Sequence, residues 1–138
     1  MILEAALLLA ILMDHKKEEA KQLTSVYAER FELPPSLVHA IVSVKSNYHP
    51  EKIGENGEIG LMQLNCVRVV QLGFFGQCSE LHDMDKNLFY GMRALKNAYI
   101  ECGRVSSCTI VRFRRFMEGN PKRRNENERR EKQKRNLR

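Results

Sequence analysis

Several residue types are scarce in this 138-residue chain, and each scarcity excludes a class of protein. Tryptophan is absent, and prolines and glycines number only four and eight, so the chain is neither collagen-like nor dominated by linkers. No apolar stretch approaches the roughly 18 residues of a membrane-spanning helix. Hydrophobic residues nevertheless make up 43% of the chain, which is enough for a packed core and excludes wholesale disorder. The length suits a single domain.

Surplus positive charge is missing from most of the chain, although the formal net charge is +6. Residues 1–121 carry equal numbers of acidic and basic side chains, and the whole surplus lies in residues 122–138. Leu137 is the one large aliphatic residue of this tail, so the tail cannot bury an apolar face. We expect a solvated, charged helix that frays. Contact with a polyanion, such as nucleic acid, anionic lipid or a cell-wall polymer, is the functional alternative.

The other end of the chain holds a short apolar run, Ala5–Met13, which reads AALLLAILM. Its length matches the core of a signal peptide, but Glu4 precedes it and no A-x-A cleavage site follows. A degenerate export signal is the first interpretation of residues 1–16, and an apolar start to the first helix is the alternative. Nine helical residues span only about 14 Å, which argues against a membrane anchor.

The four cysteines allow three pairings, and the sequence does not choose among them. The short spacing across Gly103 favours Cys102 with Cys108, which leaves Cys66 and Cys78 as a second pair. Disulfides would require an oxidising compartment. The alternative is four reduced cysteines that pack as small hydrophobic residues.

Metal-ligand spacing is missing as well. The chain has no C-x-x-C pattern, which a zinc site would favour. The histidines show no ligand-like spacing either, at His15, His39, His49 and His82. We therefore expect no metal and no other cofactor.

Helical periodicity dominates the chain between its two ends. Apolar residues recur at helical spacing in residues 17–31, 36–47, 61–72, 87–102 and 106–118. Gly103 closes the fourth of these segments, and Ser106 or Ser107 caps the fifth. Gly119–Pro121 stops the fold. Residues 51–60 hold three glycines and are expected to form a loop or a short polar ribbon. With no convincing hairpin, the predicted fold class is all-α.

Three segments stand out as motifs: VSVKSNYHP at 42–50, GEIGLMQL at 57–64 and LHDMDKNLFYGMRAL at 81–95. Together they resemble the lytic transglycosylases, lysozyme-like bacterial enzymes that cleave the β-1,4 bond of peptidoglycan. The resemblance extends over roughly residues 24–119. It implies a lysozyme-like domain of five to six helices at 17–121, with a glycine-containing loop beside a sugar groove. It also implies glycan strands as the partner and a periplasmic or cell-envelope location.

The position of the catalytic acid departs from this family. Lytic transglycosylases use one glutamic acid, directly before a serine, to protonate the glycosidic oxygen and then to close a 1,6-anhydro ring. Here Lys45 precedes Ser46. An ammonium is a poor base until it loses a proton. At about 4 Å and an effective dielectric near 20, it repels an oxocarbenium-like carbon by about 4 kcal/mol, roughly a thousandfold in rate. Cleavage is therefore expected to be lost or severely reduced.

The resemblance assigns groove roles to only some of the other candidate residues. The resemblance assigns Gln63 and Met62 to the sugar groove. Tyr48 and Tyr90 are polar aromatic residues that could line it, with half-buried packing as the alternative. Glu55 and Glu58, in the loop that follows, are the other carboxylates considered for a displaced acid, and solvated loop residues are the alternative there.

A last family element, Tyr-Asn-x-Gly, matches Phe116–Gly119, with Phe113 as an alternative counterpart of the tyrosine. The glycine is kept, whereas the hydroxyl and the amide are lost, and Phe116 remains as a candidate groove residue. Three functions follow: an impaired lytic transglycosylase, a non-catalytic module for peptidoglycan binding or assembly, and a polyanion contact through residues 122–138.

Overall fold

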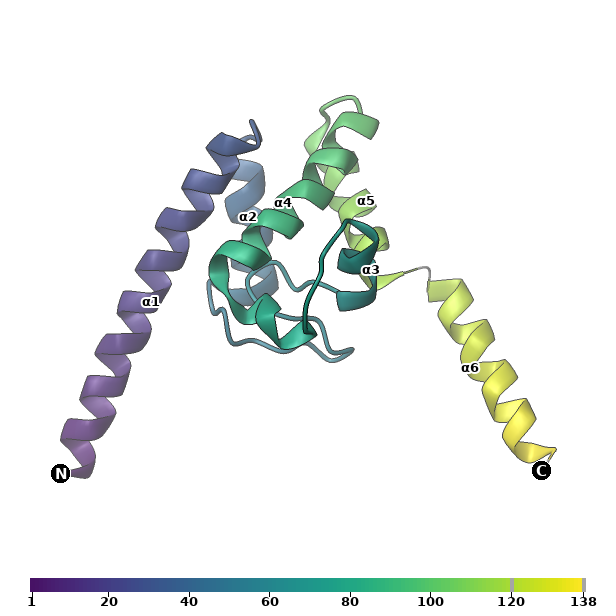
Figure 1. Ribbon diagram of the computed structural model, residues 1–138, viewed down its shortest axis with the longest axis horizontal. Coiled ribbons are helices and arrows are strands. Elements are labelled where there is room, and N and C mark those ends of the chain that lie inside the picture. Colours follow the sequence, from purple (N-terminus) through teal and green to yellow (C-terminus); the bar gives the residue numbers. More distant parts are fainter. Residues whose placement is uncertain (120, 138) are drawn as a thin grey trace.

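The computed structural model describes residues 1–119 and 121–137, and the regular structure there is helical (Figure 1). The elements are α1 (Ile2–Arg30), α2 (Pro35–Ser46), α3 (Cys66–Gln71), a 3-10 helix η1 (Cys78–His82), α4 (Met84–Glu101), α5 (Ser106–Glu118) and α6 (Pro121–Asn136). Two isolated bridges join Ile53 to Ile59 and Ile59 to Leu64 within the loop after α2. The predictions of an all-α class and of a loop at 51–60 are confirmed.

The third predicted helix is wrong in its first half. Residues 61–65 form a turn, and α3 begins only at Cys66. Gln63 has a φ of +52°, in the left-handed region, which an α-helix cannot contain. The cap of α5 also differs, because Val105 occupies that position and no side chain accepts a hydrogen bond there. The helix at α4 starts earlier than expected, since the Asp83 side chain caps it by accepting from the N–H of Lys86 at 2.9 Å.

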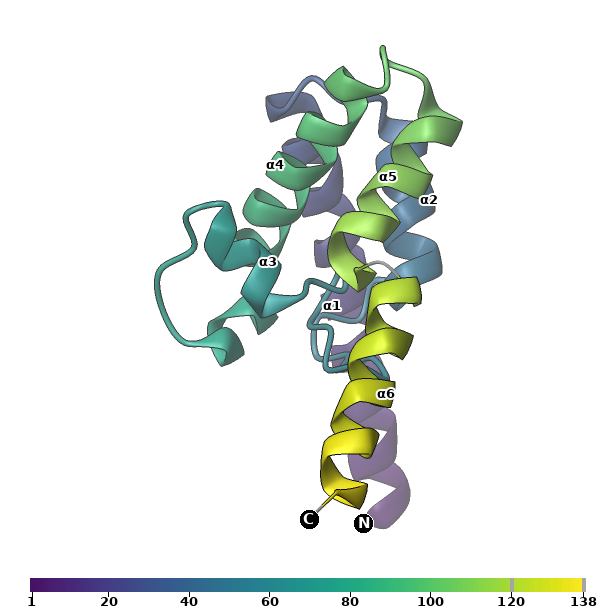
Figure 2. The ribbon, with the colours of Figure 1, turned by 90° about the vertical axis from the view of Figure 1, so that its right-hand side faces the viewer.

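The central helix α4 organises the core. It packs against α1, α5 and η1, while α1 also packs against α2. Figure 2 shows α4 and α5 running side by side. The buried face of α4 consists of Asn87, Leu88, Gly91, Met92, Ala94, Leu95 and Ala98. On α1 the predicted apolar face also points inward, with Ala20 and Tyr27 buried and Leu23 and Phe31 packed at its edge.

The turn at Gly60–Gln63 is fixed to α4 by Asn87, whose side chain is fully buried. The Asn87 amide donates to the carbonyl oxygens of Ile59 at 2.8 Å and Leu81 at 2.9 Å. Its Oδ1 accepts from the backbone N–H of Met62 at 2.9 Å. One side chain thus joins the loop, η1 and α4, and it pairs three backbone groups of buried residues that have little access to water.

Two glycines make this contact possible. Gly60 has a φ of +75°, and a Cβ at this position would lie 2.9 Å from the carbonyl oxygen of Leu81. On α4, a Cβ at Gly91 would lie 3.1 Å from the Cβ of Met62 and closer still to its sulfur. The motifs at 57–64 and 81–95 are therefore two halves of one packing contact.

Both cysteine pairs that the spacing favours form disulfides. Cys66 is bonded to Cys78 and Cys102 to Cys108, each with a Cα–Cα distance of 5.7 Å. The first joins the start of α3 to the start of η1, and the second closes the turn between α4 and α5. Since the described part of the chain contains no sheet, these bonds restrain the short elements that local propensity alone holds weakly.

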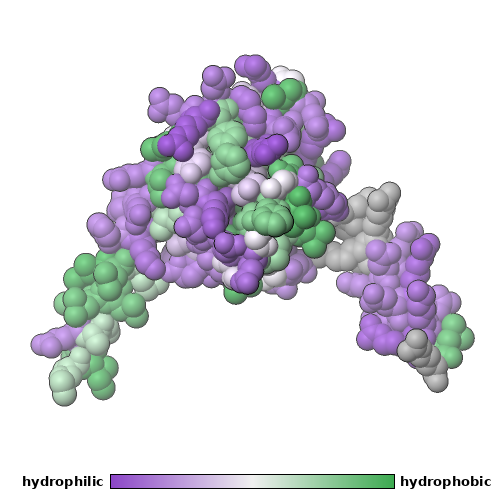
Figure 3. Space-filling model, viewed as in Figure 1, coloured by the Kyte–Doolittle hydropathy of each residue, from purple (hydrophilic) through white to green (hydrophobic). Residues whose placement is uncertain are grey.

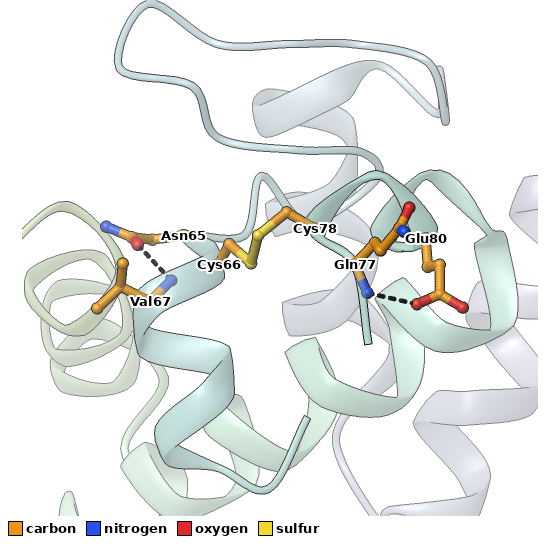
Figure 4. The surroundings of a disulfide bond; sticks show 6 residues. All are labelled: Asn65, Cys66, Val67, Gln77, Cys78 and Glu80. Atoms are coloured by element: carbon orange, nitrogen blue, oxygen red, sulfur yellow. Dashed lines mark hydrogen bonds between the residues drawn. A yellow bond between two sulfur atoms is a disulfide. The ribbon is translucent and has the colours of Figure 1, made fainter. Parts of the chain in front are cut away.

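A hydrogen-bonded cap lies on each side of the first disulfide (Figure 4). The Asn65 side chain accepts from the N–H of Val67 at 3.1 Å, and the N–H of Gln77 donates to Glu80 at 2.6 Å. The Lys86 ammonium and this backbone donor lower the pKa of Glu80. The disulfide thus connects two elements that are each fixed at their first residue.

Two helical segments project from the same side of the body, the first half of α1 and all of α6 (Figures 1 and 2). The run Ala5–Met13 is part of α1 and exposed, and Figure 3 shows a hydrophobic stretch there, in contrast to the hydrophilic residues 126–136 of α6. Residues 126–137 are exposed as well. None of the helices in the described ranges has the length and apolar content to cross a bilayer. Asn120, in the predicted stop, and Arg138, the end of the predicted tail, lie outside the described residues.

Candidate functional site

Lys45 lies in the last turn of α2 and is paired with an acid from a distant part of the chain. Its Nζ lies 3.1 Å from Oε1 of Glu118, the last residue of α5. The two side chains are 23% and 37% exposed, so the pair is partly shielded from water. The Lys52 ammonium in turn donates to the backbone carbonyl of Lys45 at 2.7 Å. Two cations therefore lie at the C-terminal end of α2, where the helix dipole is negative.

The neighbouring residue Ser46 is buried and bonded within its own helix. Its hydroxyl donates to the carbonyl oxygen of Val42 at 3.1 Å. The chain then leaves the helix at Asn47, which has a left-handed φ of +48° and whose side chain accepts from Lys17 of α1 at 3.3 Å. These contacts hold the end of α2 in place, and the Ser46 hydroxyl is engaged with the backbone of its own helix.

A cavity of about 1430 Å³ lies between α3, α4 and α5 and is lined in part by Glu118. Small residues of α4, Ala94 and Ala98, form part of one wall, and Leu72, directly after α3, and Phe116 of α5 contribute others. The ion pair of Lys45 and Glu118 therefore stands at the border of this space.

Arginine is the most frequent charged residue around the cavity. Arg112 and Arg115 of α5 line it, as does Arg68 of α3. Arg112 Nε lies 2.8 Å from Oε2 of Glu101. The Arg68 guanidinium lies over the ring of Phe116, at 6.0 Å from its centroid, which is the outer range of a cation–π contact.

The other groove residues predicted from the resemblance lie elsewhere. Met62 is fully buried against α4. The Gln63 amide donates to the backbone carbonyls of Gly60 at 2.9 Å and Lys52 at 3.2 Å. Tyr90 packs edge-on against two phenylalanine rings, with centroids 5.3 Å and 5.0 Å away. These residues support the loop and core, and only Phe116 of the predicted groove set lines the cavity described here. Their roles in binding stay predictions.

Tyr48 belongs to a hydrogen-bond chain between α1 and α2. Its hydroxyl lies 2.7 Å from Nδ1 of His39, and the other ring nitrogen lies 2.8 Å from Ser25. Burial raises the pKa of Tyr48 and lowers that of His39, and the nearby Lys21 ammonium lowers the His39 value further. Both effects disfavour ionisation, so this chain holds neutral groups at neutral pH.

The partner of Lys45 was not found from the sequence. Glu118 belongs to the Phe116–Gly119 element and lies 73 residues away from Lys45 along the chain. The available signal was a charge pattern: a base stands where an acid is expected, and an acid appears in the element that normally contacts it. Within residues 1–119 and 121–137, no group of three or more histidines, cysteines or acids is placed to hold a metal ion.

The comparisons with known proteins agree with this geometry. The family model described as the Transglycosylase SLT domain matches residues 22–136, somewhat more than the 24–119 covered by the motifs. Neither the curated proteins nor the solved structures gave a match. The matched region includes the loop, α4 and both residues of the ion pair. Since the match covers most of the chain and the fold is the expected helical one, this protein belongs to the transglycosylase SLT family, within the lysozyme-like superfamily.

Proposed function

We propose that this protein binds peptidoglycan strands through its SLT domain and cleaves them far more slowly than an active lytic transglycosylase, or not at all. The observation that carries the proposal is the ion pair of Lys45 and Glu118 at the border of the cavity. The family reaction begins with a protonated carboxyl beside the glycosidic oxygen. Here the position before Ser46 offers an ammonium instead of a carboxyl, and the nearby Glu118 is already engaged in the ion pair.

The ion pair also changes the electrostatic argument. Lys45 alone would repel an oxocarbenium-like carbon, but the Glu118 carboxylate at 3.1 Å offsets much of that positive charge. The main defect is therefore the missing acid rather than the added cation. Glu58 is a poor substitute, because its carboxylate accepts from the N–H of Asn56 at 3.1 Å and so stabilises its own turn.

Binding and cleavage can be measured on the same sample. Purified insoluble peptidoglycan is incubated with the full chain, the pellet is assayed for protein, and the supernatant is assayed for 1,6-anhydro products. We expect protein in the pellet and products near the level of the protein-free control. Absence of protein from the pellet at every salt concentration would refute binding, and abundant anhydro products would refute the impaired site.

A second candidate function, polyanion contact, rests on the charge of the tail. Residues 122–138 hold the whole net charge of +6, and the tail forms an exposed helix over 126–136. We propose that this helix contacts an anionic polymer beside the domain at 17–121. Truncation after Pro121 should abolish binding to heparin or double-stranded DNA that weakens with added salt. Unchanged binding after truncation would exclude the tail.

The periplasm or cell envelope is the proposed location. The support is the substrate of the family together with two disulfides, which form in oxidising compartments. We further propose residues 1–16 as a degenerate export signal. Alkylating free thiols in intact cells and then fractionating them tests both proposals. Oxidised protein is expected in the envelope fraction, whereas reduced protein in the cytosol would contradict both.

A further inference from the structure

We infer that the cavity between α3, α4 and α5 recognises carboxylate groups carried by the glycan strand, and not the sugar backbone alone. This inference rests on the proposed binding of peptidoglycan and specifies which chemical groups of the strand the domain recognises. Its residues are Arg68 on one side, Arg114 and Arg115 on the other, and Asn97 of α4. They line the same cavity as Glu118, the partner of Lys45, but none of them belongs to that ion pair.

The charge balance of the cavity favours an anionic occupant. Of the acids that line it, Glu101 is paired with Arg112 at 2.8 Å and Glu118 is paired with Lys45 at 3.1 Å. Among the described residues, no acidic side chain lies within salt-bridge distance of Arg68, Arg114 or Arg115. Three guanidinium groups therefore remain around a concave surface, where their attraction for an anion adds up.

The geometry suits carboxylates in particular. A guanidinium offers parallel N–H donors that match the two oxygens of a carboxylate. Arg68 comes from α3 and lies over the Phe116 ring of α5, so it reaches across the cavity toward the opposite side. The small side chains of Ala94 and Ala98 leave space between the two sides. An extended polymer can thus lie in the cavity with its acidic substituents near both sets of arginines.

Peptidoglycan strands supply such groups from two sources. Each muramic acid carries a lactyl carboxyl, which is either free or joined to a short peptide with carboxylates of its own. Chitin has the same type of backbone without the lactyl group. The shared chemistry is a carboxylate attached to a β-1,4-linked amino sugar strand. Comparing three oligosaccharides of equal length, peptide-bearing, peptide-free and chitin, separates the backbone from its substituents.

The test measures the affinity of the full chain for these three oligosaccharides by fluorescence anisotropy at fixed salt. Both acidic strands should bind at least about tenfold more tightly than chitin, as expected for charge-assisted hydrogen bonds. Arg68→Gln and Arg115→Gln should each lose about tenfold in affinity for the acidic strands and little for chitin. Arg68→Lys should lose part of the affinity, because lysine keeps the positive charge but lacks the parallel N–H donors of the guanidinium. Arg93→Gln, an exposed residue of α4 outside the cavity, serves as the matched control.

The outcomes separate the two claims. No binding to any of the three strands would overturn the proposed function, and this inference with it. Equal binding to chitin and to the acidic strands, unchanged in Arg68→Gln and Arg115→Gln, would overturn the inference and leave the function standing. If the peptide-bearing strand binds more tightly than the peptide-free strand, the inference holds and the recognised carboxylates are those of the peptide. If the two acidic strands bind equally, the inference holds and the recognised carboxylate is that of the lactyl group. All variants share the same tail, so differences among them report on the cavity.

Discussion

The side chain of Lys45 forms an ion pair with that of Glu118, and this contact joins the last turn of α2 to the last residue of α5. The C-terminal ends of both helices carry a negative dipole, which a lysine stabilises and a glutamate does not. The family's catalytic glutamate is electrostatically unfavourable at such a position. Lys45 therefore lies where the helix dipole favours its charge, and it is paired with an acid as well.

The ion pair should make a small, measurable contribution to stability. Because both side chains are partly exposed, we expect a coupling energy of about 0.5–1 kcal/mol between Lys45→Met and Glu118→Gln. A double-mutant cycle of urea unfolding measures it. The exposed pair of Glu18 and Lys21, at 3.5 Å, is the control and should give a smaller value. A coupling near zero for the first pair would show that the two charges act independently.

Asn87 should be one of the most sensitive positions in the chain. Asn87→Ala removes the partners of three backbone groups in buried surroundings, and we expect it to lower the free energy of unfolding by about 3 kcal/mol or more. Asn97→Ala, at an exposed position of the same helix, should change it by less than about 0.5 kcal/mol. Urea denaturation followed by circular dichroism compares the two. Equal effects would disprove the role of Asn87 in holding the loop.

The two disulfides should each contribute to stability. They close loops with sequence separations of 12 and 6 residues. Chain-entropy arguments give about 2–3 kcal/mol for loops of this size, slightly more for the longer one. Replacing Cys66 and Cys78 together by serine, or Cys102 and Cys108 together, should lower the urea midpoint accordingly. If adding a reductant leaves the midpoint of the unmodified protein unchanged, the bonds do not contribute as described.

Stability should fall in mildly acidic solution because of His39. Its pKa in the folded protein lies below the ordinary value of 6.5, through burial and the Lys21 charge. As the pH falls below 6.5, the unfolded chain takes up the proton first, so the folded state loses stability until the folded pKa is passed. The lowered pKa of Glu80 reduces stability only when the pH falls below about 4.5, the ordinary pKa of this group, and so does not contribute in this range. His39→Gln should flatten the pH dependence of the unfolding midpoint between about pH 7 and 5, whereas His15→Gln, on the projecting part of α1, should not. A slope that persists in His39→Gln would contradict this assignment.

The parts of the fold that follow a local pattern were predictable from the sequence. The inward faces of α1 and α4 follow helical spacing, and the disulfide pairing follows from short separations along the chain. The turn at 61–65 was not predictable from spacing, because its apolar residues fit a helix equally well. What prevents the helix is the left-handed backbone at Gly60 and Gln63, which periodicity does not reveal.

The candidate site was also predictable from the sequence only where the pattern is local. Lys45 could be identified from its position before Ser46, because the motif is local. Its partner Glu118 lies 73 positions further along the chain, and Asn87 lies 25 positions from Met62, whose N–H it binds. A single sequence does not reveal contacts over such separations. The arginines of α3 and α5 come to line one cavity only in the folded chain. The sequence therefore pointed to position 45, and the structure supplied its surroundings.

The most direct test of the altered site is a zymogram with peptidoglycan embedded in the gel. Three full-length chains are compared: the unmodified protein, Lys45→Glu, and Lys45→Gln as the control that removes the charge without adding an acid. Lys45→Glu restores a carboxyl directly before Ser46, so the variant regains a group that can protonate the glycosidic oxygen. We predict clearing by Lys45→Glu alone. Strong clearing by the unmodified chain would contradict the account.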